Sequence, residues 1–337
     1  MKLRPSNLLL LFLLLFVSCS NGNRFQINTD KNRINVQISR FDKDLILLDT
    51  NHIAFSVRNL YKKYPDFLPA YIQNLDTVSP SDTAAIAISL KKFVAYPSLQ
   101  TIYRKVLSTF SDVSNIEKEI SDAYTYIHFY FPQLKLPQVY FFVSGLALPI
   151  LMDENMNFIG IGSDFYLGAD FAPYHSITYE YMLYNMRPES VSVDLVSALL
   201  FYYFRFDSKQ NRLIDNMIHR GKVLYLLSVF MPGKEQKDII GYSDSQWNWS
   251  VKNEKEIWKT IISQKALFSS DELVIRQYLN DAPFTTPISQ ESPGRLGAWV
   301  GMRIVESYMN HHRKITLQQL MQTNDYQSIL EKSEYNP

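Results

Sequence analysis

The chain opens with a short, unbroken apolar run. Residues 8–17 are ten consecutive apolar residues; Lys2 and Arg4 precede them, and the small residue Ser18 follows. A helix needs about 20 apolar residues to cross a bilayer, so this run is too short to span one. A basic start, a short apolar stretch and a small residue at its end are typical of a secretory signal. We therefore predict that residues 1–18 are a signal peptide.

Three later stretches have the pattern of β-strands. Apolar and polar residues alternate over 34–41, which predicts a half-buried strand. Residues 138–144 and 158–166 are rich in β-branched and aromatic side chains, and the mostly polar stretch 153–157 between them suits a hairpin turn. Together these stretches predict a small sheet of three or four strands.

Elsewhere, apolar residues recur every three or four positions, which is the spacing of amphipathic helices. Residues 191–204 are apolar on almost every side and predict a core helix. Helices are expected over residues 51–75 (interrupted at Pro65 and Pro69), 84–94, 98–131 (with a break near Ser111), 191–204, 211–231, 243–263, 271–280, 293–311 (with Ser292 and Pro293 at its start) and 316–323. We therefore expect an α+β fold, mostly helical, forming a single domain over residues 32–337.

Two glycines lie four positions apart in the expected helix 293–311. Gly297 and Gly301 share one face of that helix, so either a second helix packs closely there or a partner protein docks on it. Val300 and Ile304 lie along the same stripe and favour packing in the core.

Charge and aromatic content narrow the function classes. The chain has 34 basic and 33 acidic residues, and loss of the signal peptide removes Lys2 and Arg4, which leaves a net charge of about −1. This balance gives no reason to expect nucleic acid or anionic lipid as a partner. The 22 Tyr and 21 Phe residues can build a large core or an aromatic groove.

The only cysteine of the chain lies at the end of the first apolar run. Cys19 follows Ser18 directly, and this arrangement resembles a bacterial lipobox, in which the cysteine is acylated and becomes the first residue. Several acyl chains at one site supply the multiple signals that stable anchoring needs. We therefore predict lipidation of Cys19, with residues 19–31 as a polar tether. The tether has no acidic run after the cysteine, which favours a periplasm-facing position.

Several separated stretches, in order along the chain, resemble the gliding-motility lipoprotein GldB family of Bacteroidetes. Besides the lipobox they are Ile-Ser-Arg-Phe-Asp-Lys-Asp-Leu at 38–45, Tyr-Phe-Pro at 130–132 with Leu-Pro at 136–137, Phe-Tyr-Leu-Gly-Ala-Asp at 165–170, Arg-Gly-Lys-Val-Leu-Tyr at 220–225, Ile-Gly-Tyr-Ser at 240–243 and Ser-Pro-Gly-Arg-Leu-Gly-Ala-Trp-Val-Gly at 292–301. The resemblance implies an outer-membrane lipoprotein that faces the periplasm. Its partners would be envelope proteins of the motility and type IX secretion machinery.

The family also resembles, distantly, zinc peptidases of the His-Glu-x-x-His type. Such a site needs two histidines four residues apart and a general-base glutamate, and no pair among the six histidines has this spacing. The helix that would carry the metal aligns with 192–198, which holds one acid, Asp194, and no histidine. A further acidic ligand aligns with Arg220, which would repel a metal. We therefore expect a degenerate zincin-like metallopeptidase shell, with no metal ligands, no cofactor and no catalytic residues.

Two sets of residues are candidates for other roles. Trp247, Trp249 and Trp258 belong either to the core or to an exposed partner surface. Thr77 and Thr83 each follow an aspartate and precede an apolar residue, a pattern that resembles periplasmic O-glycosylation sites and equally fits a plain surface loop.

The sequence thus favours a non-enzymatic protein that is held at a membrane by its lipid and acts through contacts with envelope proteins. Two alternatives stay open. One is a hydrolase with an unrecognised site, and the other is a binder of a small ligand that uses the aromatic side chains.

Overall fold

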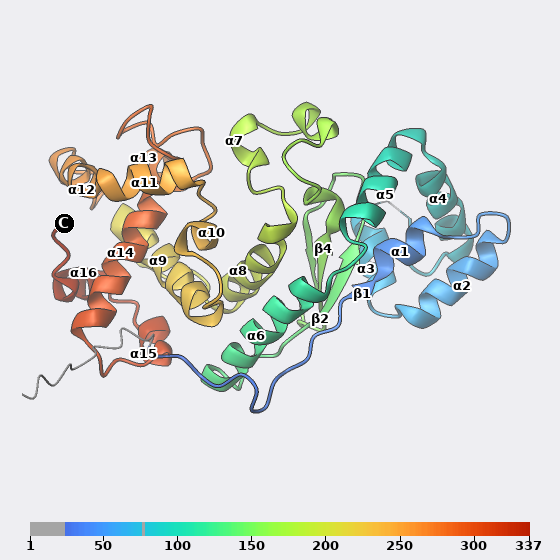
Figure 1. Ribbon diagram of the computed structural model, residues 1–337, viewed down its shortest axis with the longest axis horizontal. Helices are drawn as coiled ribbons and strands as arrows, with labels where there is room; N and C mark the ends of the chain where they lie inside the picture. Colours follow the sequence, from blue (N-terminus) through green and yellow to red (C-terminus); the bar gives the residue numbers. More distant parts are fainter. Residues whose placement is uncertain (1–23, 76–77) are drawn as a thin grey trace, which may run out of the picture.

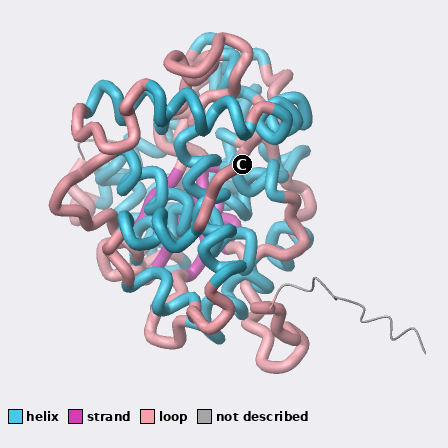
Figure 2. Tube along the Cα trace, turned by 90° about the vertical axis from the view of Figure 1, so that its left-hand side faces the viewer, coloured by secondary structure: helices cyan, strands magenta, loops and turns pink. Residues whose placement is uncertain are grey.

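The described part of the chain is mostly helical and contains one small sheet. The computed structural model describes residues 24–75 and 78–337. In Figure 1 the sheet stands between the helices α1 to α5 on one side and α6 and α8 on the other. Figure 2 shows the strands in magenta, enclosed by helices in cyan. The expected α+β, mostly helical fold is confirmed.

The sheet has four strands in the order β1-β2-β4-β3. The strands are β1 (Ser39–Arg40), β2 (Gln138–Phe142), β3 (Ile150–Met152) and β4 (Phe158–Gly162). The strands β1, β2 and β4 are parallel, and β3 runs antiparallel to β4. All of β4 is buried, as expected for a parallel strand that is covered on both faces.

The predicted hairpin turn at 153–157 is present, but its strands differ from the prediction. The turn joins β3 to β4, whereas β2 and β4 pair in parallel. The three-residue strand β3 was missed because its apolar run is too short to show a period.

The strand predicted over 34–41 is mostly wrong. Only Ser39 and Arg40 join the sheet. The extended segment before them lies along α6 (Ser114–Tyr130). Its backbone amides donate to α6 side chains, from Ile34 to Thr125 Oγ1 (2.9 Å), from Val36 to Ser121 Oγ (2.9 Å) and from Ile38 to Glu117 Oε1 (2.8 Å). Two residues of extended chain span about 6.6 Å and four residues of helix about 6 Å, so the two periods match.

The N-terminal helices follow the predicted pattern, except that the first, over residues 41–46, was not predicted. They are α1 (Phe41–Ile46), α2 (Ile53–Lys63), α3 (Phe67–Leu75), α4 (Thr83–Ala95), α5 (Pro97–Thr109) and α6. Pro65 separates α2 from α3, but Pro69 does not interrupt the helix as predicted. It lies in the first turn of α3, where a missing N–H costs no helical hydrogen bond.

The C-terminal helices form the larger half of the molecule. They are α7 (Glu180–Leu183), α8 (Val191–Tyr203), α9 (Leu213–Phe230), α10 (Gln236–Ile240), α11 (Asp244–Lys252), α12 (Glu254–Ser263), α13 (Glu272–Leu279), α14 (Leu296–His311), α15 (Leu317–Gln322) and α16 (Tyr326–Ser333). The helix expected over 243–263 is two helices that meet at Asn253. The helices α7, α10 and α16 were not predicted.

The start of α14 also differs from the prediction. Ser292 does not cap the helix, because its hydroxyl accepts a hydrogen bond from the Thr285 amide (3.0 Å). The helix begins only at Leu296, and Arg295 before it has a φ of 59°, in the left-handed region. Gly294 lets the chain pass close to Ala282 before the helix begins, since a Cβ on it would lie 2.4 Å from the carbonyl oxygen of Ala282.

The helices α9 and α14 touch through their backbones. A Cβ on Gly301 of α14 would lie 1.8 Å from the Met217 carbonyl oxygen of α9, and a Cβ on Gly221 of α9 would lie 2.2 Å from the Gly301 carbonyl carbon. Gly297 faces Tyr278 of α13, where a Cβ would lie 3.0 Å from the carbonyl oxygen. The glycine stripe of α14 therefore packs against other helices, which is the first of the two explanations given above.

We predict that Gly301→Ala destabilises the fold strongly. The added methyl group meets rigid backbone, so the cost should lie at or above the upper end of the usual overpacking range, about 3 kcal/mol. Urea denaturation of the two proteins measures it. Gly233→Ala is the matched control, because a Cβ there meets nothing within 4 Å. Equal stability of both variants would contradict the close contact.

Candidate functional site

A polar cleft of about 290 Å³ lies among α7, α8, α9, α10 and the start of α14. It contains both segments that the sequence comparison with zinc peptidases had aligned. Asp194 of α8 and Arg220 of α9 line the same cleft, although 26 residues separate them along the chain. Arg295, Asp281 and Asp238, which were not among the candidate site residues from the sequence, complete its charged lining.

The loop before α14 positions Arg295. Its guanidinium is held from two sides, by Asp281 (Nε to Oδ1, 3.0 Å) and by the carbonyl oxygen of Ile240 (2.7 Å). Tyr242, which is fully buried, donates its hydroxyl to the carbonyl oxygen of Gly294 (2.6 Å). These contacts fix the left-handed turn at Arg295 and direct its charge into the cleft wall.

Arg220 is the less satisfied of the two cations. One of its nitrogens donates to the carbonyl oxygen of Leu279 (2.7 Å). Among the described residues no carboxylate forms an ion pair with it, although a guanidinium offers five N–H donors. Burial and, after it, the charge of Arg295 lower the pKa of Arg220, while the charge of Asp281 opposes that shift. The cleft therefore brings together two cations that repel each other.

Asp194 is the acid of the cleft that lies deepest. Its Oδ2 accepts a hydrogen bond from the Tyr166 hydroxyl (2.9 Å). Burial raises the pKa of Asp194 to about 6, while the Tyr166 hydrogen bond and the charge of Arg295 oppose that rise. A carboxyl group in this position holds its proton more readily than one in water.

The other acids of the cleft are already paired. Asp238 forms an ion pair with Arg187 (2.9 Å), and Asp281 forms the pair with Arg295. Two guanidiniums beside paired carboxylates form a site that can recognise a carboxylate or phosphate through charge-assisted hydrogen bonds. Within the described part of the chain, no three His, Cys, Asp or Glu side chains are placed to hold a metal ion.

A second, larger hollow of about 650 Å³ lies among α3, α4 and α5. Its lining is mainly apolar and aromatic, with Tyr71, Phe93 and Leu99 among its residues and Lys92 as its charged side chain. Beside it lies the buried Asp164, whose Oδ2 accepts hydrogen bonds from the amides of Ser144 and Leu146. A small apolar ligand would suit this hollow, and that alternative from the sequence stays a prediction.

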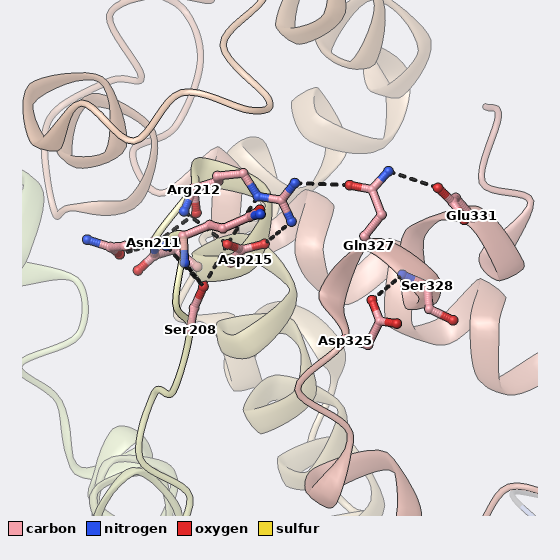
Figure 3. Close-up of polar contacts among 10 residues, drawn as sticks. Ser208, Asn211, Arg212, Asp215, Asp325, Gln327, Ser328 and Glu331 are labelled. Carbon is pink, nitrogen blue, oxygen red and sulfur yellow. Dashed lines mark hydrogen bonds and ion pairs between the residues drawn. The ribbon is translucent and has the colours of Figure 1, made fainter.

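A further cluster of polar side chains joins the start of α9 to α16 (Figure 3). Arg212 pairs with Asp215 (2.8 Å) and donates to Gln327 Oε1 (3.1 Å), and Ser208 donates to Asp215 Oδ2 (2.8 Å). Asp325 caps α16 by accepting from the Ser328 amide (2.9 Å). These groups bond mainly to one another, so this region is part of the scaffold.

Of the residues predicted as sites, the three tryptophans and Thr83 lie in the described part of the chain. Trp258 is buried, and Trp247 and Trp249 are half-buried against the core. A partner surface at these tryptophans stays a prediction. Thr83 is exposed at the start of α4, directly after the capping residue Asp82, and its glycosylation also stays a prediction.

Three of the sequence predictions lie outside the described residues. They are the signal peptide, the lipidation of Cys19 and the modification of Thr77.

The pKa of Asp194 predicts a pH-dependent effect of Asp194→Asn on stability. The folded-state pKa, about 6, lies above the ordinary value of 3.8, so the charged form destabilises the fold as the pH rises from about 4 to 6. At pH 8 we expect the variant to be more stable than the wild type by about 1–2 kcal/mol. The gain is limited to this range because part of the side chain faces the cleft, where solvent screens its charge. At pH 4 the difference should vanish.

Urea midpoints at both pH values measure this difference, with the exposed Asp170→Asn as the control for introducing an amide. A gain that is the same at pH 4 and pH 8 would show that the charge of Asp194 is not its cause.

The comparisons with known proteins place the chain in one family. Among the described residues, none of the helices is both long and apolar enough to cross a membrane. No curated protein and no solved structure matches the chain, so the expected zincin-like shell has no support from a known structure. Residues 22–337 match the model of a lipoprotein family described as gliding motility protein GldB. Because this match covers nearly the whole chain, the protein belongs to the GldB family of gliding motility proteins.

Proposed function

We propose that this GldB-family protein is an outer-membrane lipoprotein that faces the periplasm and acts by binding, without catalysis. Its partner presents a carboxylate, from an acidic side chain or a chain end, to the cleft lined by Arg220 and Arg295. In the cell that partner is an envelope protein of the gliding and secretion machinery. The family membership and the lipobox at Cys19 support the location, and the cleft supports the mode of action.

The single observation that carries the proposal is the state of Arg220. It lines the cleft and lacks an ion-pair partner among the described residues. Burial and, after it, the charge of Arg295 lower its pKa, while the charge of Asp281 opposes that shift. A partly buried cation without an ion-pair partner in contact with it is costly, and a bound anion reduces that cost. The three acids near it cannot serve equally well, because each is already engaged with Tyr166, Arg187 or Arg295.

The size of the cleft fits a small anchor better than a large ligand. Its volume of about 290 Å³ lies at the lower limit for pockets that hold whole small molecules. Apolar side chains such as Phe201 and Leu224 line it beside the charges. One acidic residue with its neighbours on a partner protein would fill such a space. A buried charged anchor of this kind often dominates the energy of an interface.

The membrane tether predicts a change of compartment in Cys19→Ala. Without the thiol no acyl chain can be attached, so the variant should leave the membrane fraction, and its mass should show no lipid. Fractionation of the cell envelope and intact mass measurement check both results. A variant that stays in the membrane fraction as the wild type does would refute lipid tethering at this residue.

The cleft predicts that Arg220 binds small dicarboxylates. Succinate should raise the Tm of the wild type, and Arg220→Gln should weaken the apparent affinity roughly tenfold to hundredfold, the usual loss of one charge-assisted hydrogen-bonding partner. Arg220→Lys should retain part of the affinity, because it keeps the charge. Inorganic phosphate, used in parallel, tests whether any anion suffices.

Arg276→Gln is the matched control for this experiment. Arg276 is exposed on the neighbouring helix α13 and pairs with Glu272, so its loss should leave succinate binding unchanged. If the wild type does not respond to either anion, or if Arg220→Gln binds succinate as the wild type does, the anionic cleft is not a binding site.

A further inference from the structure

The described chain enters the fold at a fixed point. Arg24 donates to the carbonyl oxygens of His312 and Ile315 (3.5 and 3.3 Å), which lie between α14 and α15. The next residue, Phe25, is buried, and its carbonyl oxygen accepts from the hydroxyl of Tyr130 at the end of α6 (2.8 Å). Figure 1 shows the blue start of the described chain beside α15. The first described residues are thus joined to the loop between α14 and α15 and to the end of α6.

Little chain is left between this point and the residue that would carry the lipid. Five peptide units separate Cys19 from Arg24. Fully extended, they span at most about 18 Å. A domain of this length has a radius of gyration of about 20 Å. A tether this short therefore cannot bring the opposite end of the molecule to the bilayer. Only the surface around Arg24 can lie on the lipid.

That surface has the side chains that suit an anionic lipid surface. Arg24, Arg313 and Lys314 are exposed, and none of the three forms an ion pair within the described ranges 24–75 and 78–337. Phe129 is 63% exposed and its ring contacts that of Tyr130, which also bonds to the entering chain. Cations attract anionic headgroups, and an aromatic ring at the same level can enter the interface.

We propose that this surface, the membrane-facing end defined by Arg24, Phe129, Arg313 and Lys314, rests on an anionic phospholipid bilayer. The proposal rests on the acylation of Cys19 proposed above and adds the orientation of the domain. Composition alone does not predict it, because the net charge of the mature chain is close to zero. The positive charge is local, and it gathers where α14 ends and the chain enters the fold.

Quenching of a dye by labelled lipid tests the orientation in the full-length, acylated protein. The acylated Cys19 has no free thiol, so a cysteine introduced by Phe129→Cys is the only one that a thiol-reactive dye can label. The vesicles contain phosphatidylcholine, phosphatidylglycerol and a headgroup-labelled quencher lipid. Phe55→Cys is the matched control, because Phe55 is 60% exposed on α2, at the other end of the molecule in Figure 1. We expect strong quenching at 129 and little at 55.

Charge reversal tests the lipid chemistry. Arg313→Glu combined with Lys314→Glu should lower the quenching at 129 on anionic vesicles, with an apparent affinity of the end for the surface about tenfold weaker. Lys91→Glu with Lys92→Glu, two exposed lysines of α4, is the control and should have no such effect. Added salt should mimic the first double variant.

The outcomes separate this inference from the proposed function. A mature protein whose mass carries no acyl chain overturns both the tether and the orientation. An acylated protein that is quenched equally at 129 and 55 overturns the orientation alone. Strong quenching at 129 that is insensitive to the double charge reversal and to salt overturns the anionic-lipid surface. A dye at 129 that is shielded from lipid by a bound protein would do the same.

Discussion

The backbone contact between α9 and α14 sets the geometry on which the candidate site depends. Gly221 and Gly301 let the two helices approach until a single methyl group on either would meet main-chain atoms. Arg220 is the direct neighbour of Gly221, and Arg295 immediately precedes α14. The two guanidiniums therefore come together because the helices that carry them touch. Like charges are brought together at a cost, and the cost is met by the large buried area around the contact, where Trp299 and Met217 are fully buried.

The electrostatics of the cleft follow from this crowding. Asp281 and the Ile240 carbonyl satisfy Arg295, and the Tyr166 hydroxyl satisfies Asp194, but Arg220 has one carbonyl partner. Burial raises the pKa of Asp194 to about 6, so near neutral pH a small change in its surroundings can change its charge. A neutral Asp194 makes the cleft more positive, and an ionised Asp194 partly compensates Arg220. The affinity for an anion should therefore increase as the pH falls through this range.

Much of this architecture could be predicted from local patterns. Helices such as α5 and α6 show a clear apolar period, and the turn at 153–157 has the polar residues that a hairpin needs. The segment 34–38 failed because alternation reports only an extended chain with one buried side, and here α6 side chains replace a neighbouring strand. The start of α14 failed because Ser292 is engaged by Thr285, a contact between residues whose pairing no local pattern shows.

The site was harder to predict than the fold. Asp194 and Arg220 drew attention only through an aligned motif, as places where metal ligands were missing. In the structure, Arg295 and Asp281 line the same cleft as Asp194 and Arg220, and the four side chains form a charged site. No local pattern predicts Arg295 or Asp281, since both belong to irregular loops. A charged site assembled from two helices and two loops depends on tertiary contacts alone. A sequence pattern can show which residue type is missing, but not which new chemistry the remaining residues form.

The proposed lipid tether and the position of the cleft together define how the molecule is oriented on the membrane. In Figure 1 the chain enters beside α15 at the lower left, whereas α7, which lines the cleft, lies at the top. If the membrane-facing end rests on lipid, the cleft is held away from the bilayer, where the soluble part of an envelope protein can reach it. A short tether restricts the rotation of the domain and raises the effective concentration of the cleft in one layer above the membrane. Both effects favour a partner that is itself fixed in the envelope, because such a partner searches only that layer. A freely diffusing ligand would gain nothing from this arrangement, and that difference is the physical reason to prefer a neighbouring envelope protein as the source of the carboxylate.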